Sequence, residues 1–556
     1  MIRVLVLALV AAVFPQQPPR DSPSQTGTAS ISGVVIAAAD KQPIGYARVA
    51  LSDSARITYT NAKGEFVFPK LPAGRYAISA QASGYLPMSL GQSRSGRPGV
   101  AQVLAAGEER KGVVLAMHKG GIVAGHVVGP DGRPLADVNV GALRKSWAQD
   151  GSTVFVWSAP GKTDDRGDYR IAGLIAGTYL VEVVPPGIIG RENSTTIDDA
   201  QRLATEGMIQ TFYPGTTDPA AAASITVDVD TERAGIDFNI QPTPMVRVSG
   251  HVDGVVVGPV PTRPAGQINA GSLRLLPPGQ AAGAMLASNT GRGPFARVTP
   301  DGRFRFEAVP VGQYELLYSW SDAGRAGSFG ASPVTVGDRD IEDATVDAHP
   351  AASITGEIVT ANAPGKPASV PLFGLIPLSG LWRENSNFIP ARIESPGKFA
   401  IDGLAPGRYA FSAAAPAAGK YLSKVEVDGA LATGTVIEIG ASDTKNVRVT
   451  FAEDAAEVAG NIRREDLSPV SEYALVIFPS DKREWPVWMT GAGIARPDSS
   501  GRYAYPTKPG SYLIAAVADV EQNQWLDIAF LESLIPGATK ITLGPSQKLT
   551  QDFVVK

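Results

Sequence analysis

After residue 30 the chain consists largely of short segments in which apolar and polar residues alternate, with glycine or proline at the ends of each segment. A period of two places every second side chain on the same face of a β-strand. Five such segments each begin just after a glycine and place their first aromatic residue at Phe66, Tyr169, Phe304, Phe399 and Tyr503. The pattern predicts strands that bury one face in a core and leave the other in solvent.

These segments belong to a motif that occurs five times. A glycine opens the segment, and a second glycine precedes a tyrosine by two residues. The five sets are Gly64, Gly74 and Tyr76; Gly167, Gly177 and Tyr179; Gly302, Gly312 and Tyr314; Gly397, Gly407 and Tyr409; and Gly501, Gly510 and Tyr512. The first glycine suits a turn that needs positive φ. The tyrosine is expected to bury its ring and bond its hydroxyl to nearby backbone, as in the tyrosine corner of β-sandwiches.

Each copy of the motif is preceded by an apolar-x-Gly-x-apolar opener, at Gly33, Gly125, Gly250, Gly356 and Gly460, and is followed by an alternating closing run. Chance recurrence at this regularity is implausible, so we interpret the chain as an array of repeated domains. The predicted domains are residues 30–118, 119–243, 244–350, 351–453 and 454–556, called units one to five below.

The motif resembles the carboxypeptidase regulatory-like family, whose domains have a prealbumin-like (transthyretin-like) sandwich, and the first copy is also similar to the B-type repeats of bacterial adhesins. The resemblance is strongest in units one and two. It implies an all-β chain, a tandem array of about five antiparallel Greek-key β-sandwiches of prealbumin-like or Ig-like type.

Two units carry insertions after the signature tyrosine. In unit two, residues 196–208 have apolar positions at helical spacing, and in unit five the segment WLDIAFLESLIPG has the same character. We expect a short helix in each. Each insertion has two candidate roles: it protects an exposed edge strand, or it shapes a ligand site.

The N-terminus is typical of an export signal. Arg3 precedes an apolar run from Val4 to Phe14, which is too short to span a membrane. Residues 1–14 are therefore predicted to be a signal peptide, and residues 15–29, rich in Pro, Ser and Gln, a linker. The expected location is the periplasm, the outer surface or the medium, without a stable membrane anchor.

Composition argues against most kinds of chemistry. Fifty Lys and Arg against 54 Asp and Glu give a net charge of −4, which argues against a general nucleic-acid or membrane-surface binder. There is no cysteine, and none of the four histidines has the glutamate three residues later that a metallocarboxypeptidase requires. The hydrolase motif Gly-x-Ser-x-Gly is absent as well. We predict no catalytic residue, no metal, no cofactor and no enzyme activity.

The tryptophans provide the candidate binding residues. Five lie in the variable stretch between opener and signature glycine: Trp147, Trp157, Trp382, Trp485 and Trp488. Exposed indoles can stack on sugar rings, whereas buried ones pack in cores or between domains. Two main hypotheses follow: a non-catalytic envelope or extracellular protein that spaces or displays interaction surfaces, and a carbohydrate-binding protein that uses these tryptophans. An unrecognised enzyme is the third alternative, and the lack of a converging acid, base and nucleophile in the sequence argues against it. The corresponding partners are polysaccharide or other envelope proteins.

Overall fold

The structure is a computed structural model that describes residues 27–555, with the exception of 53–55, 93, 148–150, 186–205, 256–257, 260–267, 277–294, 323–324, 362–371, 380–387, 414–419 and 486–491. The predicted signal peptide, most of the linker, Trp382, Trp488 and residues 196–205 of the predicted unit-two helix lie outside the described residues. In the described part of the chain, no helix has the length and apolar character to cross a membrane.

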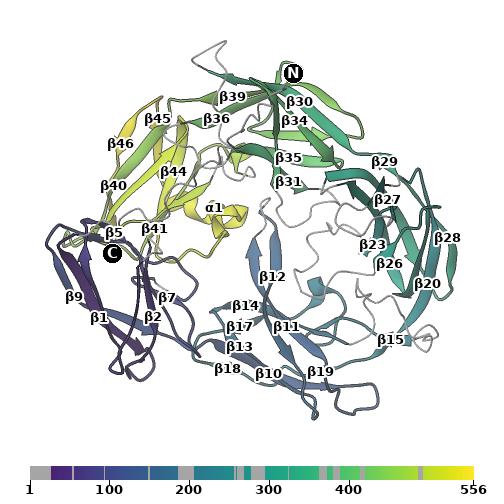
Figure 1. The fold of residues 1–556 in the computed structure, drawn as a ribbon, viewed down its shortest axis with the longest axis horizontal. Helices are drawn as coiled ribbons and strands as arrows, with labels where there is room; N and C mark the ends of the chain where they lie inside the picture. The colour runs from purple at the N-terminus through teal and green to yellow at the C-terminus, as the bar shows by residue number, and fades with distance from the viewer. Residues whose placement is uncertain are drawn as a thin grey trace, which may run out of the picture.

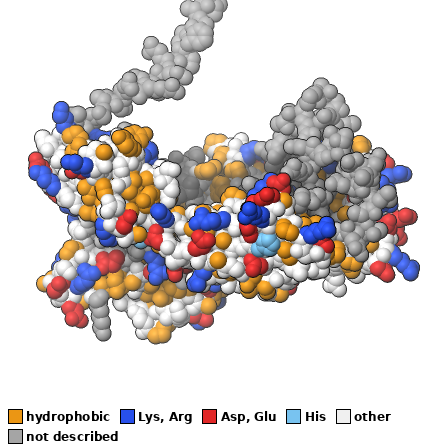
Figure 2. Space-filling model, turned by 90° about the horizontal axis from the view of Figure 1, so that it is seen from below, with side chains coloured by type: hydrophobic (Ala, Val, Ile, Leu, Met, Phe, Trp, Pro, Cys, Tyr) orange, Lys and Arg blue, Asp and Glu red, His pale blue; other side chains and the backbone are white. Residues whose placement is uncertain are grey.

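Five β-sandwiches follow one another around a closed ring, and unit five lies beside unit one (Figure 1). Each sandwich turns one sheet outward and the other toward the centre of the ring. Figure 2 shows the ring from one side, where acidic and basic side chains are interspersed. The tandem array predicted from the repeats is therefore present, and it closes on itself.

The outer sheet of each unit contains the opener strand at or near its middle. The outer strands are β4 (Glu65–Leu71), β1 (Ala29–Ala37) and β9 (Glu109–Met117) in unit one; β13 (Asp168–Leu174), β10 (Gly121–Val128), β18 (Glu232–Arg233) and β19 (Phe238–Asn239) in unit two; β20 (Pro242–Asp253), β25 (Arg303–Pro310) and β28 (Ile341–Asp347) in unit three; β33 (Arg392–Ser395), β34 (Lys398–Leu404), β30 (Ala352–Thr360), β39 (Thr444–Ala452), β36 (Tyr421–Val427) and β37 (Ala430–Leu431) in unit four; and β43 (Arg502–Thr507), β40 (Ala456–Arg464), β46 (Lys548–Thr550) and β47 (Phe553–Val555) in unit five.

The inner sheet of each unit contains the strand that begins at or just after the signature tyrosine corner. The inner strands are β3 (Ile57–Tyr59), β2 (Arg48–Leu51), β6 (Ile78–Gln81) and β7 (Met88–Ser89) in unit one; β12 (Thr153–Lys162), β11 (Asn139–Trp147), β14 (Gly177–Val184), β16 (Thr211–Phe212) and β17 (Ile225–Val227) in unit two; β24 (Phe295–Arg297), β23 (Ser272–Leu276), β26 (Gly312–Asp322), β27 (Arg325–Val336) and β29 (His349–Pro350) in unit three; β32 (Ile389–Pro390), β31 (Phe373–Ser379), β35 (Gly407–Ala413) and β38 (Val436–Ile439) in unit four; and β42 (Gly493–Ala495), β41 (Ala474–Pro479), β44 (Gly510–Val517) and β45 (Thr539–Leu543) in unit five. Two small ribbons complete the strands: β5 (Gly74–Tyr76) with β8 (Gln102–Leu104), and β21 (Gly258–Pro259) with β22 (Ile268–Asn269).

Each unit closes around its own hydrophobic core. The buried apolar residues form one main cluster between the two sheets of every unit, and these clusters span 29–117, 123–240, 246–346, 352–451 and 456–543. Alternation along the strands produces this arrangement, because in β4 Phe66 and Phe68 are buried while Val67 between them is exposed.

The signature tyrosine makes the same hydrogen bond in all five units. Its hydroxyl donates to the carbonyl oxygen four residues earlier, at 2.7–3.0 Å: Tyr76 to Pro72, Tyr179 to Ile175, Tyr314 to Pro310, Tyr409 to Ala405 and Tyr512 to Lys508. Four of the rings are buried, while Tyr314 is only half-buried. The bond ties the corner after the outer sheet to the first residues of the inner strand, as the tyrosine-corner hypothesis expects.

The opener glycine is required by the strand that lies beside it. In every unit the closing strand runs parallel to the opener strand, a feature that the prediction of antiparallel sheets did not include. A carbonyl oxygen at or next to this closing strand would lie 1.8–2.1 Å from a β-carbon added at Gly33, Gly125, Gly250, Gly356 or Gly460. No side chain fits at that separation.

The two insertions differ. In unit five, helix α1 (Ile528–Leu534) is present, flanked by the short 3₁₀ turns η5 (Gln524–Leu526) and η6 (Ile535–Gly537). Leu531 of α1 packs with Phe478 and Trp485 on the centre-facing side of the inner sheet, so α1 covers a sheet face and not a sheet edge. In unit two, the last three residues of the predicted helix instead form strand β15 (Glu206–Met208), which pairs with the start of β20. Two further 3₁₀ turns are η2 (Pro219–Ala221) and η4 (Lys482–Glu484).

Candidate functional site: the junction of units one, two and five

The ring is closed by an acidic segment of unit five that follows β44. The carboxylate of Asp519 accepts a hydrogen bond from Arg97 Nε of unit one at 2.7 Å, and Arg94 Nε lies 3.4 Å from its second oxygen. Two residues later, Glu521 accepts from Arg144 Nη2 of unit two at 3.1 Å. The Arg97 side chain is only 5% exposed, so its charge depends on these carboxylates for solvation. One short segment therefore joins three units.

Trp147 adds a fourth link to the same segment. It ends strand β11 of unit two, and its indole Nε1 donates to Asp527 Oδ2 at 3.0 Å. Asp527 is also the N-cap of α1, where Oδ1 accepts from the backbone N–H of Ala529. The position of α1 is thus tied to unit two through a single carboxylate.

A second contact joins unit five to unit one through the signature turn. Asp498 is fully buried, and its Oδ2 lies 3.1 Å from Arg75 Nη1 of unit one. The backbone N–H of Ser499 donates to the Ala101 carbonyl at 3.1 Å, and Ser499 Oγ accepts from the Val103 N–H at 3.2 Å. Burial alone would raise the pKa of Asp498, but hydrogen bonds from Ser500 and Arg502 and the charge of Arg75 lower it overall. The Asp498 carboxylate therefore stays ionised in the folded protein, and its negative charge holds the turn against Arg75 of unit one.

The centre-facing side of unit two holds a buried carboxylic acid. Glu182 of β14 has no exposed surface; Oε2 accepts a hydrogen bond from Gln210, while Oε1 has no hydrogen-bond partner among the described residues. A β-carbon added at Gly141 would lie 2.4 Å from the Trp157 ring and 2.9 Å from Glu182 Oε1, so indole and carboxyl share the space above this glycine. Burial raises the pKa of Glu182 to about 7, against a smaller lowering by Gln210.

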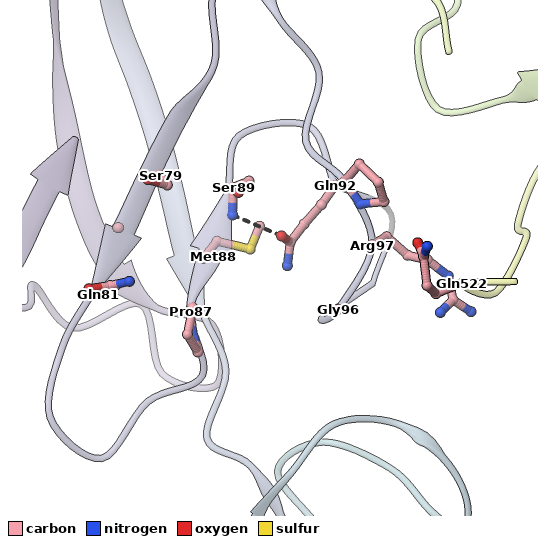
Figure 3. Close-up of a pocket in the computed structure, with 11 residues that line it drawn as sticks. Ser79, Gln81, Pro87, Met88, Ser89, Gln92, Gly96, Arg97 and Gln522 are labelled. Atoms are coloured by element: carbon pink, nitrogen blue, oxygen red, sulfur yellow. Dashed lines mark hydrogen bonds between the residues drawn. The ribbon is translucent and has the colours of Figure 1, made fainter. Parts of the chain in front are cut away.

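A pocket of about 350 Å³ lies where unit one meets unit five. In Figure 3, Gln81 of unit one and Gln522 of unit five lie on opposite sides of it, with Gln92 between them. Met88 and Arg97 also line it, and the guanidinium of Arg97 is already paired with Asp519. The lining offers amide and hydroxyl groups together with a thioether.

The described tryptophans that were predicted as sugar contacts are buried or half-buried and pack against neighbouring residues. Trp147 is 7% exposed and bonded to Asp527, and Trp485 is 4% exposed, with Nε1 donating to the Pro479 carbonyl at 2.7 Å. Trp157 is half-buried against Leu143, Leu180 and Phe212. Neither Trp147 nor Trp485 presents a ring face to a ligand, because each lies under neighbouring elements. The structure does not bring these three indoles together into one surface.

Sequence reasoning missed the residues that close the ring. Asp519, Glu521 and Asp527 stand in a polar stretch of the unit-five insertion, which is the only available signal, and nothing in it identifies Arg97 or Arg144 as partners. Arg97 and Asp519 are 422 positions apart in the chain, so no local sequence pattern indicates that they pair. Only the angles between successive units bring the two side chains together.

Comparison with known proteins gives a family for the first unit. The model of the carboxypeptidase regulatory-like domain matches residues 30–101. Unit one is similar to this family. The search of curated proteins gave no match.

Solved structures that are similar to this chain include a Bacillus anthracis protein and two streptococcal pilus proteins. The Bacillus anthracis TIE protein is 10% identical over 95% of this chain and 68% of its own, with a TM-score of 0.14. The minor pilin GBS52 of Streptococcus agalactiae is 16% identical over 39% of this chain and 97% of its own, with a TM-score of 0.21. The full-length RrgB pilus protein of Streptococcus pneumoniae is 9% identical over 78% of this chain and 98% of its own, with a TM-score of 0.14.

Proposed function

We propose that this chain is an exported, non-catalytic scaffold whose five sandwiches form a closed ring and display interaction surfaces outside the cytoplasm. The observation that carries the proposal is the uniform orientation of the units, since all five turn the equivalent sheet to the centre (Figure 1). A flexible string of domains has no reason to keep one orientation, whereas a scaffold that presents a defined inner surface does.

The junction supports the same function. Contacts between domains of one chain are commonly polar and allow relative motion. Here the contact includes a buried arginine, a fully buried aspartate and a backbone hydrogen bond, all between the two ends of the array. Such a contact stabilises one closed arrangement of the five units. Carbohydrate binding, the second candidate, is favoured by one surface of unit one that is described below.

Two measurements test the proposal. Cell fractionation with N-terminal sequencing is expected to place the chain outside the cytoplasm, without residues 1–14. Small-angle scattering of the processed chain is expected to give the radius of gyration of the closed ring. A chain retained in the cytoplasm with an intact N-terminus would contradict export, and scattering from an extended string of domains would contradict the closed scaffold.

Because the chain contains no cysteine, a single introduced pair gives a further test of closure. Ala101→Cys with Ser499→Cys lies at the backbone contact between units one and five and is expected to form a disulfide. The matched pair Ala101→Cys with Ser533→Cys, in which the second cysteine stands on helix α1 away from this backbone contact, is expected to stay reduced.

A further inference from the structure

The centre-facing side of unit one differs from that of its neighbours. In unit five this side is covered by α1 and Trp485, and in unit two it carries the cluster around Phe212 and Trp157. In unit one, Tyr59 is 64% exposed and Ile57 is 44% exposed on the edge strand β3. Of the aromatic side chains that the structure describes, only Tyr46 and Tyr59 are this exposed, and both belong to unit one.

Strand register places polar groups next to Tyr59. Arg48 of β2 pairs with Tyr59 on one side and with Gln81 of β6 on the other. Directly paired residues of antiparallel strands project on the same face, so the three form a row about 10 Å long across two strand spacings. The Arg48 side chain makes no hydrogen bond or ion pair within the part of the chain that the structure describes. The row ends at the pocket that Gln81 lines.

The pocket contains an unused hydrogen-bond donor. Gln92 Oε1 accepts from the backbone N–H of Ser89 at 2.8 Å, which fixes the direction of the amide (Figure 3). Gln92 Nε2 is buried and has no acceptor among the described residues. A buried N–H without a partner costs about 1–3 kcal/mol, so a ligand oxygen at this point gains an unusually favourable bond.

We propose that the centre-facing surface of unit one binds an oligosaccharide, with Tyr59 stacking on one sugar ring and the pocket beside Gln92 holding another. An exposed aromatic ring beside amides, hydroxyls and a guanidinium suits the apolar face and the hydroxyl rim of a sugar. The row from Tyr59 to Gln81, about 10 Å long, is longer than one sugar ring. The proposal rests on the closed ring, because Gln522 of unit five lines the pocket, and not on export.

Affinity electrophoresis of the processed chain in gels containing soluble starch, xylan, galactomannan, β-glucan or chitin oligosaccharides tests this directly. At least one of these is expected to retard the protein. Tyr59→Ala should weaken that retention about tenfold or more, the scale of a lost aromatic contact. Tyr59→Phe should retain it, and Gln92→Leu should weaken it by removing the donor.

The matched control is Ile393→Ala, which removes another exposed apolar side chain (50%) from β33 of unit four and should leave retention unchanged. The absence of retardation by every polysaccharide would overturn the proposal. So would retention that is equal in Tyr59→Ala and Ile393→Ala. Because scattering of the same variants reports ring closure separately, a failure of the sugar site is distinguishable from a failure of the scaffold.

Discussion

The two faces of the inner sheets follow different rules. On the side that faces the core, every unit places a tyrosine whose hydroxyl bonds the carbonyl four residues earlier. On the side that faces the centre of the ring, the residue three positions after that tyrosine differs in every unit except for two serines: Ser79, Glu182, Leu317, Ser412 and Ala515. The repeated face specifies the sandwich, and the variable face distinguishes one unit from the next.

The largest loss of stability is expected from removing a signature tyrosine from the repeated, core-facing side. Tyr179→Ala removes a fully buried ring from the core of unit two and should lower the free energy of unfolding of that unit by about 3–5 kcal/mol. Hydrogen exchange in the full chain resolves this, because the loss of protection should be confined to residues of unit two.

Tyr179→Phe separates the ring from its hydroxyl. It keeps the packing and loses only the bond to Ile175, so about 1 kcal/mol is expected. Tyr314→Ala should cost less than Tyr179→Ala, because the Tyr314 ring is half-buried. Equal losses of unfolding free energy in Tyr179→Ala and Tyr314→Ala would show that burial of the ring does not determine how much the tyrosine corner stabilises its unit.

The sequence was sufficient to predict the repeated face. Alternation around Phe66 and the spacing from Gly64 to Tyr76 identify strands, turn and corner, because these depend on residues close together in the chain. The purpose of the opener glycine was not predictable, since the carbonyl that approaches Gly250 belongs to Ala344 at the end of the unit. Nor was the burial of Trp147, whose partner Asp527 lies 380 positions away. A tryptophan in a variable stretch fits packing and binding equally well until the units are placed.

The next largest effect concerns Glu182, on the centre-facing side of unit two, and the pH dependence of stability. The raised pKa means that Glu182 stays protonated in the folded protein up to about pH 7, whereas its ordinary value is 4.5. Stability is therefore present in full below about pH 4.5 and falls as the pH rises toward 7, because only the unfolded chain ionises in that interval.

Glu182→Gln removes this pH dependence. The variant should be more stable than the parent by about 2–3 kcal/mol at pH 8 and nearly equal to it at pH 5, as measured by denaturant unfolding. Glu232→Gln is the control, since Glu232 is exposed in the same unit and pairs with Arg170 at the surface. A gain for Glu182→Gln that is the same at both values of pH would contradict a buried acid and indicate better packing instead.

An effect smaller than those of Tyr179→Ala and Glu182→Gln is expected at the junction, where no repeated residue takes part. Asp519→Ala leaves the buried Arg97 without its main partner, although Glu521 remains 3.9 Å away, so we expect a loss of about 2 kcal/mol in ring closure. The radius of gyration should rise and exchange at residues 94–98 should accelerate, while the core of unit five stays protected. Asp481→Ala, which removes a carboxylate paired with Arg483 two residues away, should change neither quantity. If Asp519→Ala also accelerated exchange in the core around Tyr512, ring closure would contribute to the stability of the unit-five sandwich. The core-facing and centre-facing sides of the inner sheets would then not act independently.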